Sequence, residues 1–136
     1  MGLVGYFTAE IGLWSELHTY SGGLGVLAGD HVKSAADAEI DLVGVTLLYR
    51  EGYGRQHIDD DGNQTESFGA IDPSDHLIDT GLDLTLPLDG GTLYAKIWKV
   101  EVVGITGHVV PVYFLDTHHP KNSEYHQSMG ARLYGG

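Results

Sequence analysis

A glycine-rich turn between an apolar segment and a helical segment most constrains the fold of this chain. Residues 3–9 are short, apolar and aromatic, which indicates a buried strand. The run Ser21-Gly22-Gly23-Leu24-Gly25 then opens a stretch of helical periodicity that extends to about Ala38. Residues 42–49 are continuously β-branched and apolar, as is typical of a strand covered on both faces. This order predicts a βαβ unit with parallel strands and a right-handed crossover.

The predicted helix has an apolar face and a charged face. Charged residues such as Asp30, Lys33 and Asp37 lie largely opposite the apolar ones. The residues that we expect to face the core are Leu24, Leu27, Ala28, His31, Val32, Ala35 and Ala38.

The second half of the chain has the pattern of antiparallel strands. Residues 53–58 and 64–68 flank Asp59-Asp60-Asp61-Gly62-Asn63, which predicts a hairpin. Residues 92–103 alternate in polarity and residues 109–115 are again strand-like. The fold class is therefore α/β, with a βαβ unit followed by antiparallel β-hairpins. The end of the chain, from Asp116, is polar and shows no terminating element.

The charge of the chain excludes one class of partner. Its 19 acidic and 7 basic residues give a net charge of −12. Such a charge repels nucleic acid, so we expect no nucleic-acid partner. An acidic surface suits a high-salt environment or an ordinary cytoplasmic protein, and both interpretations remain open. There is no cysteine, no long apolar run and no signal-peptide pattern. We therefore expect a cytoplasmic protein without a membrane segment.

The glycine loop is the first candidate for a binding site. Consecutive glycines allow close approach of a ligand, and the N–H groups that begin a helix attract an anion. The loop is neither a P-loop, because no Gly-Lys-Ser/Thr follows, nor a dinucleotide fingerprint. The alternatives are an anion site and a tight turn without a ligand.

Other candidates have plainer explanations. Glu10 follows the first strand and is either a site carboxylate or, as is more usual for an acid at a strand end, a cap or a surface group. His118-His119 is a loop pair rather than a metal site, and the Asp59–Asp61 run lacks the spacing of a calcium loop. Ser21 has no nucleophile elbow around it. The aromatic residues that could stack on a sugar, or simply belong to the core, are Trp14, Tyr20, Tyr94 and Trp98.

Several segments together resemble one family. Residues 6–13 (Tyr-Phe-Thr-Ala-Glu-Ile-Gly-Leu) and 20–35 (Tyr-Ser-Gly-Gly-Leu-Gly-Val-Leu-Ala-Gly-Asp-His-Val-Lys-Ser-Ala) are similar to the amino-terminal domain of α-glucan phosphorylases, the group of glycogen, maltodextrin and starch phosphorylases. The similarity is closest to the shorter bacterial and archaeal type. The segments that continue it are 44–53, 55–56, 113–117 and Leu133-Tyr134-Gly135-Gly136. The resemblance covers essentially all 136 residues in order.

The resemblance implies a retaining glycosyltransferase of the two-domain, Rossmann-like GT-B type. Such enzymes cleave terminal α-1,4-linked glucose from a glucan with phosphate, releasing glucose 1-phosphate, and use the phosphate group of pyridoxal phosphate. By resemblance, Gly22, Gly23 and Leu24 contact substrate phosphate and sugar, and Glu10 is a carboxylate of the cleft. The expected partners are α-glucan and phosphate, and no metal is implied.

The resemblance also implies an incomplete enzyme. Residues 1–136 correspond to part of the amino-terminal domain, whereas the cofactor lysine belongs to a second domain that the sequence lacks. Gly54 stands where the family has an aromatic residue. We expect the chain alone neither to phosphorolyse glucan nor to bind pyridoxal phosphate tightly, and we expect self-association through uncovered apolar residues.

Three alternatives remain beside the phosphorylase reading. One is a glycogen or starch synthase-like GT-B fragment, although those enzymes carry a lysine before the glycine loop where this chain has Tyr20-Ser21. The second is a stand-alone carbohydrate- or phosphate-binding module without catalysis. The third is a gene remnant or an excised fragment.

Overall fold

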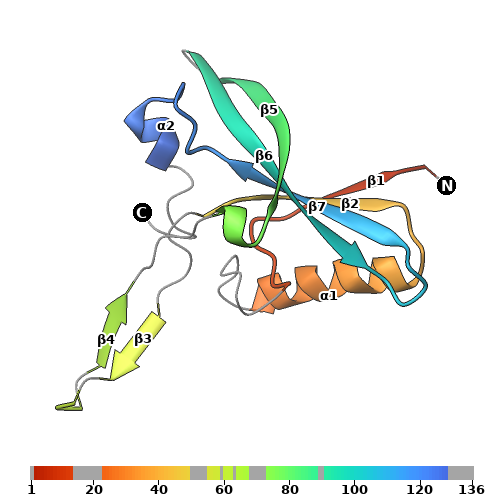
Figure 1. Ribbon diagram of the computed structural model, residues 1–136, viewed down its shortest axis with the longest axis horizontal. Helices are drawn as coiled ribbons and strands as arrows, with labels where there is room; N and C mark the ends of the chain where they lie inside the picture. Colours follow the sequence, from red (N-terminus) through yellow and green to blue (C-terminus); the bar gives the residue numbers. More distant parts are fainter. Residues whose placement is uncertain are drawn as a thin grey trace.

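The fold is a mixed α/β arrangement built around one five-stranded sheet (Figure 1). The computed structural model describes residues 2–13, 23–49, 55–58, 60–62, 64–67, 73–88 and 91–128. Its elements are β1 (Val4–Phe7), α1 (Gly23–Asp37), β2 (Leu42–Leu47), β3 (Arg55–Ile58), β4 (Gln64–Ser67), a 3-10 turn (Pro73–Asp75), β5 (Ile78–Leu88), β6 (Gly91–Val103), β7 (Val109–Asp116) and α2 (Glu124–Ser128). None of the described helices combines the length and the apolar character needed to span a membrane.

The sheet has the strand order β1-β2-β7-β6-β5. β1, β2 and β7 run parallel to one another, with Phe7 beside Val45 and Val45 beside Tyr113. β6 pairs antiparallel with both β7 and β5. The predicted parallel β1–α1–β2 unit is confirmed. The predicted β6–β7 hairpin is also confirmed, and it joins the same sheet through β7.

Helix α1 packs against one face of the sheet through small residues. Ala28, Val32 and Ala35 are buried as predicted, together with Gly25, Gly29 and Ala36. The prediction was wrong for four positions that are exposed: Leu24, Leu27, His31 and Ala38. Their exposure follows from the close approach of α1 to the rest of the fold. The helix turns its glycine and alanine residues inward, and its largest apolar residues lie on the other side.

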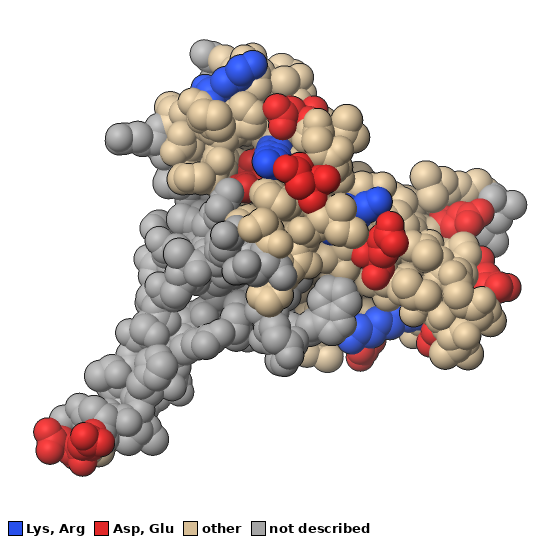
Figure 2. All heavy atoms as spheres, viewed as in Figure 1, with Lys and Arg blue, Asp and Glu red and all other residues tan. Residues whose placement is uncertain are grey.

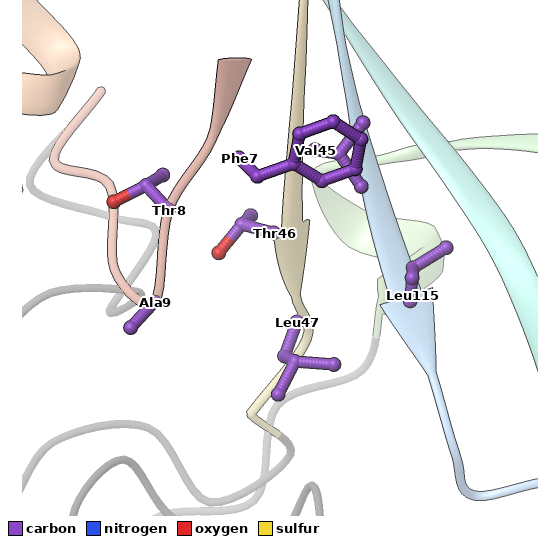
Figure 3. Close-up of a pocket in the computed structure, with 7 residues that line it drawn as sticks. All are labelled: Phe7, Thr8, Ala9, Val45, Thr46, Leu47 and Leu115. Atoms are coloured by element: carbon purple, nitrogen blue, oxygen red, sulfur yellow. The ribbon is translucent and has the colours of Figure 1, made fainter. Parts of the chain in front are cut away.

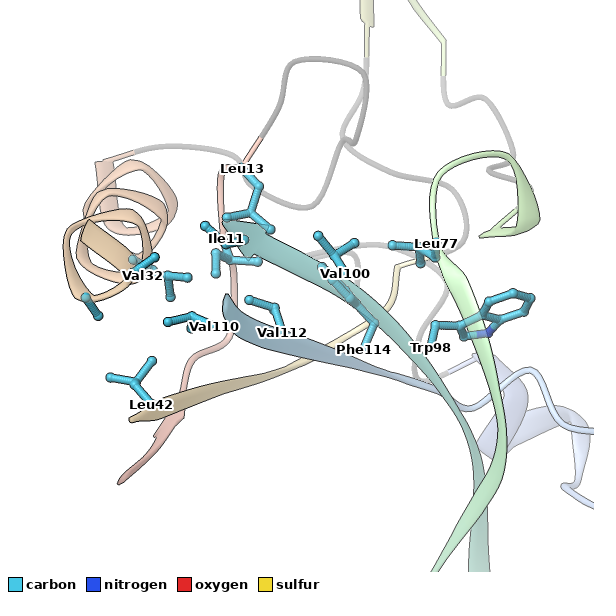
Figure 4. Packing of buried hydrophobic residues seen from close by; sticks show 14 of the residues in the cluster. Ile11, Leu13, Val32, Leu42, Leu77, Trp98, Val100, Val110, Val112 and Phe114 are labelled. Carbon is cyan, nitrogen blue, oxygen red and sulfur yellow. The ribbon is translucent and has the colours of Figure 1, made fainter. Parts of the chain in front are cut away.

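The core lies between α1 and the sheet (Figure 4). β7 supplies its centre, because Val110, Val112 and Phe114 are fully buried. Leu42, Val100 and Trp98 extend the same layer along β2 and β6.

The outer part of the sheet corrects two expectations. β1 is not a buried strand: it lies at the sheet edge, and Phe7 is 76% exposed. β2 is covered by α1 on one face only, because Val43 and Val45 on the other face are half-buried and Leu47 is exposed. The described elements therefore leave one apolar face of the parallel strands open.

The remaining elements include one hairpin that was predicted, and a strand and a helix that were not. β3 and β4 pair antiparallel around the acidic turn, as predicted. The edge strand β5 was not predicted, and α2 corrects the expectation of a terminal segment without structure. Acidic side chains are scattered over the visible face of the described part, and some lie at the tip of the β3–β4 hairpin (Figure 2).

Candidate functional site at the start of α1

The connection from β1 to α1 places a carboxylate at the helix N-terminus. Glu10 is 2% exposed, and its Oε1 accepts a hydrogen bond of 3.1 Å from the main-chain N–H of Gly25. Gly25 lies in the first turn of α1, where N–H groups have no partner within the helix. A negative charge at this end also interacts favourably with the helix dipole. Glu10 is thus a helix cap, and a cap was one of the roles expected for it.

Residues 10–13, which we call the strap, are fixed tightly onto α1. The N–H of Gly12 donates to the carbonyl of Gly25 at 2.8 Å. Gly29 faces the main-chain carbonyl of Gly12 so closely that no side chain fits between them. Ile11 and Leu13 enter the core (Figure 4). The strap therefore holds Glu10 and the first two turns of α1 as one unit.

Two further hydrogen bonds hold the chain just before the strap. The Thr8 hydroxyl donates to the carbonyl of Glu10 at 2.8 Å. The buried Tyr49 hydroxyl, beyond the end of β2, donates to the carbonyl of Ala9 at 2.8 Å. The carboxyl ends of β1 and β2 are thereby joined, and Glu10 leaves the sheet in a fixed direction.

The structure brings three of the four predicted site residues to the same end of α1. Gly23 is the first residue of the helix, and Leu24 follows it with 52% of its surface exposed. Glu10 is attached to Gly25, two positions after Gly23. Gly22 lies outside the described residues, as do the neighbouring Ser21 and the aromatic candidates Trp14 and Tyr20.

A hollow of about 350 Å³, which we call the strand-end hollow, opens beside this site (Figure 3). It lies at the carboxyl ends of the three parallel strands, which is where open α/β sheets bind ligands. Phe7, Val45, Leu47 and Leu115 make it mostly apolar. Thr46 projects toward the end of β1 and is 4% exposed, and its hydroxyl has no hydrogen-bond partner among the described residues. Sequence analysis missed this hollow, although a hydroxyl inside the apolar run 42–49 was a visible signal.

A second hollow, of about 310 Å³, lies between the β5–β6 hairpin and the segment after β7. Lys96 Nζ lies 2.9 Å from Asp79 Oδ2 and 4.5 Å from the ring centre of Trp98. The hydrogen bond from Lys96, aided by the N–H of Gly81, lowers the pKa of Asp79 below its ordinary value. Trp98 is therefore a core residue with its own partners rather than an open platform for a sugar.

The histidine pair lies beside this second hollow. His119 is buried, and its Nδ1 accepts a hydrogen bond of 3.1 Å from the N–H of Lys121. Nε2 therefore carries the proton that is donated to Asp83 at 3.1 Å. Tyr94 stacks on His119 at 5.6 Å, while His118 is exposed. The described residues contain no group of three or more side chains suited to hold a metal ion.

Comparisons with known proteins point to one group of enzymes. The chain is 40% identical to the glycogen phosphorylase of Mycobacterium tuberculosis over 98% of its own length and 16% of that protein. It is 39% identical to the maltodextrin phosphorylase of Thermococcus litoralis over 95% of its length and 16% of that protein. The glycogen phosphorylase of Aquifex aeolicus is 32% identical over 95% of the chain and 19% of that protein. No family model matches. The chain spans between 16% and 19% of the length of these relatives.

Proposed function

Because this chain is related to the α-glucan phosphorylases over nearly its whole length, we propose that it forms one wall of the glucan- and phosphate-binding cleft of such an enzyme. The observation that carries this proposal is the 40% identity over 98% of the chain. The domain we propose is part of an amino-terminal, Rossmann-like GT-B domain, residues 1–136. The parallel β1–α1–β2 unit supports it, since such units form the core of Rossmann-like domains.

The proposed reaction is phosphorolysis of an α-1,4-glucan in the cytoplasm. An oxygen of inorganic phosphate bonds to C1 of the terminal glucose, the C1–O4 bond breaks, and O4 of the shortened glucan takes a proton. The product is glucose 1-phosphate with retained configuration. In this reaction the chain positions the substrate. Gly23 and Leu24 present main-chain N–H groups at the N-terminus of α1, which favours the phosphate, and the proposal assigns Gly22 to the same ligand by its resemblance alone.

Glu10 has a defined part in this arrangement. Its carboxylate already accepts the N–H of Gly25, so it fixes the direction of the first helical turn toward the ligand. A misplacement of about 1 Å costs an enzyme about a hundredfold in rate. We therefore propose that Glu10 is a positioning residue for the loop at Gly23 and Leu24.

The cofactor of this family, pyridoxal phosphate, supplies an acid–base phosphate group when it is bound. The described residues do not fit it. The four lysines of the chain lie elsewhere: Lys33 is on the exposed side of α1, and the others contact Asp79, Glu101 and the ring of Tyr94. None lines the strand-end hollow. We propose that the remaining part of a phosphorylase-length polypeptide holds the cofactor.

A chimera tests the proposal. The segment of the Mycobacterium tuberculosis glycogen phosphorylase that matches this chain is replaced by residues 1–136, and release of glucose 1-phosphate from glycogen and phosphate is measured. We expect activity in the chimera and none from the chain alone. A chimera that folds and binds pyridoxal phosphate but releases no product contradicts the proposal. Release of glucose 1-phosphate by the chain alone would contradict the proposal that the chain forms only one wall of the cleft.

Variants of the chimera test the site itself. Glu10→Gln is expected to lower kcat/KM by about tenfold or more, because the charge that fixes the helix start is lost. Glu101→Gln is the matched control, since this exposed carboxylate on β6 lies outside the proposed site and pairs with Lys99. Equal effects of the two substitutions would contradict a role of Glu10 in the cleft.

A further inference from the structure

The turn that follows β7, residues 117–122, carries a buried imidazole that contacts both strands of the β5–β6 hairpin. This imidazole belongs to His119, which is 8% exposed. Its ring stacks on Tyr94 of β6 with 5.6 Å between the ring centres. Its Nε2 lies 3.1 Å from Asp83 Oδ2 on β5. One side chain therefore connects this turn to the hairpin.

A main-chain N–H of the same turn decides which ring nitrogen carries the proton. The N–H of Lys121 donates to His119 Nδ1 at 3.1 Å, and a main-chain N–H is a donor only. Nδ1 is therefore unprotonated in this arrangement, and Nε2 carries the proton that is donated to Asp83. The neutral ring thus satisfies the turn through one nitrogen and β5 through the other.

A second proton on this ring has opposite effects at the two nitrogens. An imidazolium donates from both of them, so the N–H of Lys121 would then face another N–H at Nδ1 and lose its acceptor. The contact between Nε2 and Asp83 would become an ion pair, because Nε2 remains a donor to a carboxylate. Protonation of His119 therefore weakens the closure of the turn and strengthens the attachment of the ring to β5.

The side chain of Lys121 is affected in the same direction. Its Nζ lies 5.4 Å from the ring centre of Tyr94, on which His119 also stacks. A protonated His119 brings a second positive charge to this ring, and like charges repel. The N–H and the ammonium group of Lys121 are thus both destabilised in their present positions when His119 gains a proton.

The groups that surround the ring keep it in place in either state. Gln127 of α2 is neutral, and its Nε2 donates to the carbonyl of His119 at 3.1 Å. Lys96 lies beside the same hollow and is paired with Asp79 at 2.9 Å. The charged and titratable groups near the ring are Asp79 and Asp83 of β5, Tyr94 and Lys96 of β6, Asp116 at the end of β7, and His118 and Lys121 of the turn. Asp83 is the carboxylate that contacts the ring directly, so the change on protonation is confined to the turn.

We propose that His119 is a pH-sensitive latch: the neutral ring closes the turn 119–122 through the N–H of Lys121, and the protonated ring releases that turn while it stays bound to Asp83. Imidazole is the side chain whose ordinary charge change falls between about pH 5 and pH 8, a range in which carboxylates stay charged. His119 and Pro120 line the second hollow. Release of the turn therefore changes the shape of this hollow.

Nuclear magnetic resonance of the 136-residue chain tests the proposal at about pH 8 and about pH 5. At the higher pH, the nitrogen shifts of the His119 ring are expected to show a proton on Nε2 and none on Nδ1. At the lower pH, we expect the protection of the Lys121 amide against hydrogen exchange, relative to its intrinsic rate at each pH, to fall by about tenfold. The Asn122 amide donates to the carbonyl of His119 at 3.0 Å and should keep its protection.

Three variants separate the latch from other titrations. His119→Gln is expected to remove the pH dependence at the Lys121 amide, because its amide N–H donates to Asp83 but does not titrate. His118→Gln is the matched control, since His118 is exposed beside the same hollow, and it should leave the pH dependence unchanged. Asp83→Asn is expected to move the release to lower pH, because the protonated ring loses its carboxylate partner.

Circular dichroism checks that the variants fold, and Asp83→Asn keeps the test decisive if His119→Gln does not, since the Asp83 side chain is 56% exposed. A proton on Nδ1 at about pH 8, or equal protection of the Lys121 amide at both pH values, overturns the proposal. So does an equal loss of protection at Lys121 and Asn122, or a pH dependence that survives His119→Gln, disappears in His118→Gln or is unmoved by Asp83→Asn.

Discussion

Gly29 in α1 lies directly against the main-chain carbonyl of Gly12 in the strap, and a Cβ atom at position 29 would overlap that carbonyl. The obstructing atoms belong to the backbone, so they cannot turn aside as a flexible side chain would. We expect Gly29→Ala to lower the free energy of unfolding by about 1–3 kcal/mol, the usual cost of overpacking. Urea unfolding followed by circular dichroism measures it.

Gly23→Ala is the control for this substitution. Gly23 belongs to the same helix, and a Cβ atom there meets no atom of the described residues within 4 Å. Alanine is the better helix former, so this variant is expected to be as stable as the parent or up to about 1 kcal/mol more stable. A comparable loss of stability in both variants would show that the contact with Gly12 is not the cause.

Substitution of Glu10 is expected to weaken the joint between the strap and α1. Glu10→Gln keeps an oxygen acceptor for the N–H of Gly25 but loses the charge, and we expect a loss of about 1–2 kcal/mol in the free energy of unfolding. Faster hydrogen exchange at the Gly25 amide should accompany it. Glu101→Gln, which removes an exposed ion pair, should cost less than about 1 kcal/mol. An unchanged rate of hydrogen exchange at the Gly25 amide would contradict the role of Glu10 as a helix cap.

A substitution at Thr46 is expected to raise stability rather than lower it. Its hydroxyl is buried and finds no hydrogen-bond partner in the part of the chain that the structure describes, and such a group costs about 1–3 kcal/mol. Thr46→Val replaces it with a methyl group of similar shape, so we expect stability to rise by about 1 kcal/mol. Thr46→Ser keeps the hydroxyl and loses a methyl group, and it should be less stable than the parent. A destabilised valine variant in thermal unfolding would show that the hydroxyl has a partner.

The elements that the sequence predicted are those with strong local signals. Helix α1 begins within the glycine run and ends one residue before Ala38. The hairpin of β3 and β4 follows from an acidic turn with glycine and asparagine. Its two strands pair in the predicted places because the turn fixes their register.

The features that the sequence analysis missed depend on contacts between distant segments. In β5, Leu82, Leu84, Leu86 and Leu88 alternate, but Gly81 and Pro87 mask the pattern, and the strand exists as a partner of β6. The buried side of α1 was predicted wrongly because the strap packs so closely on the helix that only small residues fit between them.

The residues of the candidate site were proposed from their type and their place in the chain, but their geometry could not be predicted from the sequence. Glu10 was recognised as a carboxylate after a strand, yet its partner Gly25 lies 15 positions away and is reached only because the strap packs on α1. The strand-end hollow needs β7, whose parallel pairing with β2 no local pattern indicates. The sequence therefore predicts candidate residues for the site, whereas tertiary packing decides which of them meet.

The ion pair between Asp79 and Lys96 predicts a dependence of stability on pH. The hydrogen bond from Lys96 lowers the pKa of Asp79 in the folded chain, so the folded chain releases this proton more readily than the unfolded chain. The stabilisation is therefore complete above the ordinary carboxyl pKa of about 4 and is lost as the pH falls through the lowered value. It is small, because both side chains are more than one-third exposed.

A double-mutant cycle with Asp79→Asn and Lys96→Met isolates this interaction from the other effects of each substitution. We expect a favourable coupling free energy in urea unfolding at neutral pH, no coupling once the carboxyl group is protonated, and a smaller coupling in concentrated salt. Lys96 also lies over the ring of Trp98, and that contact remains when Asp79 is neutral. A coupling that persists unchanged in acid would therefore mean that Asp79 acts on Lys96 through its placement over Trp98 rather than through its charge.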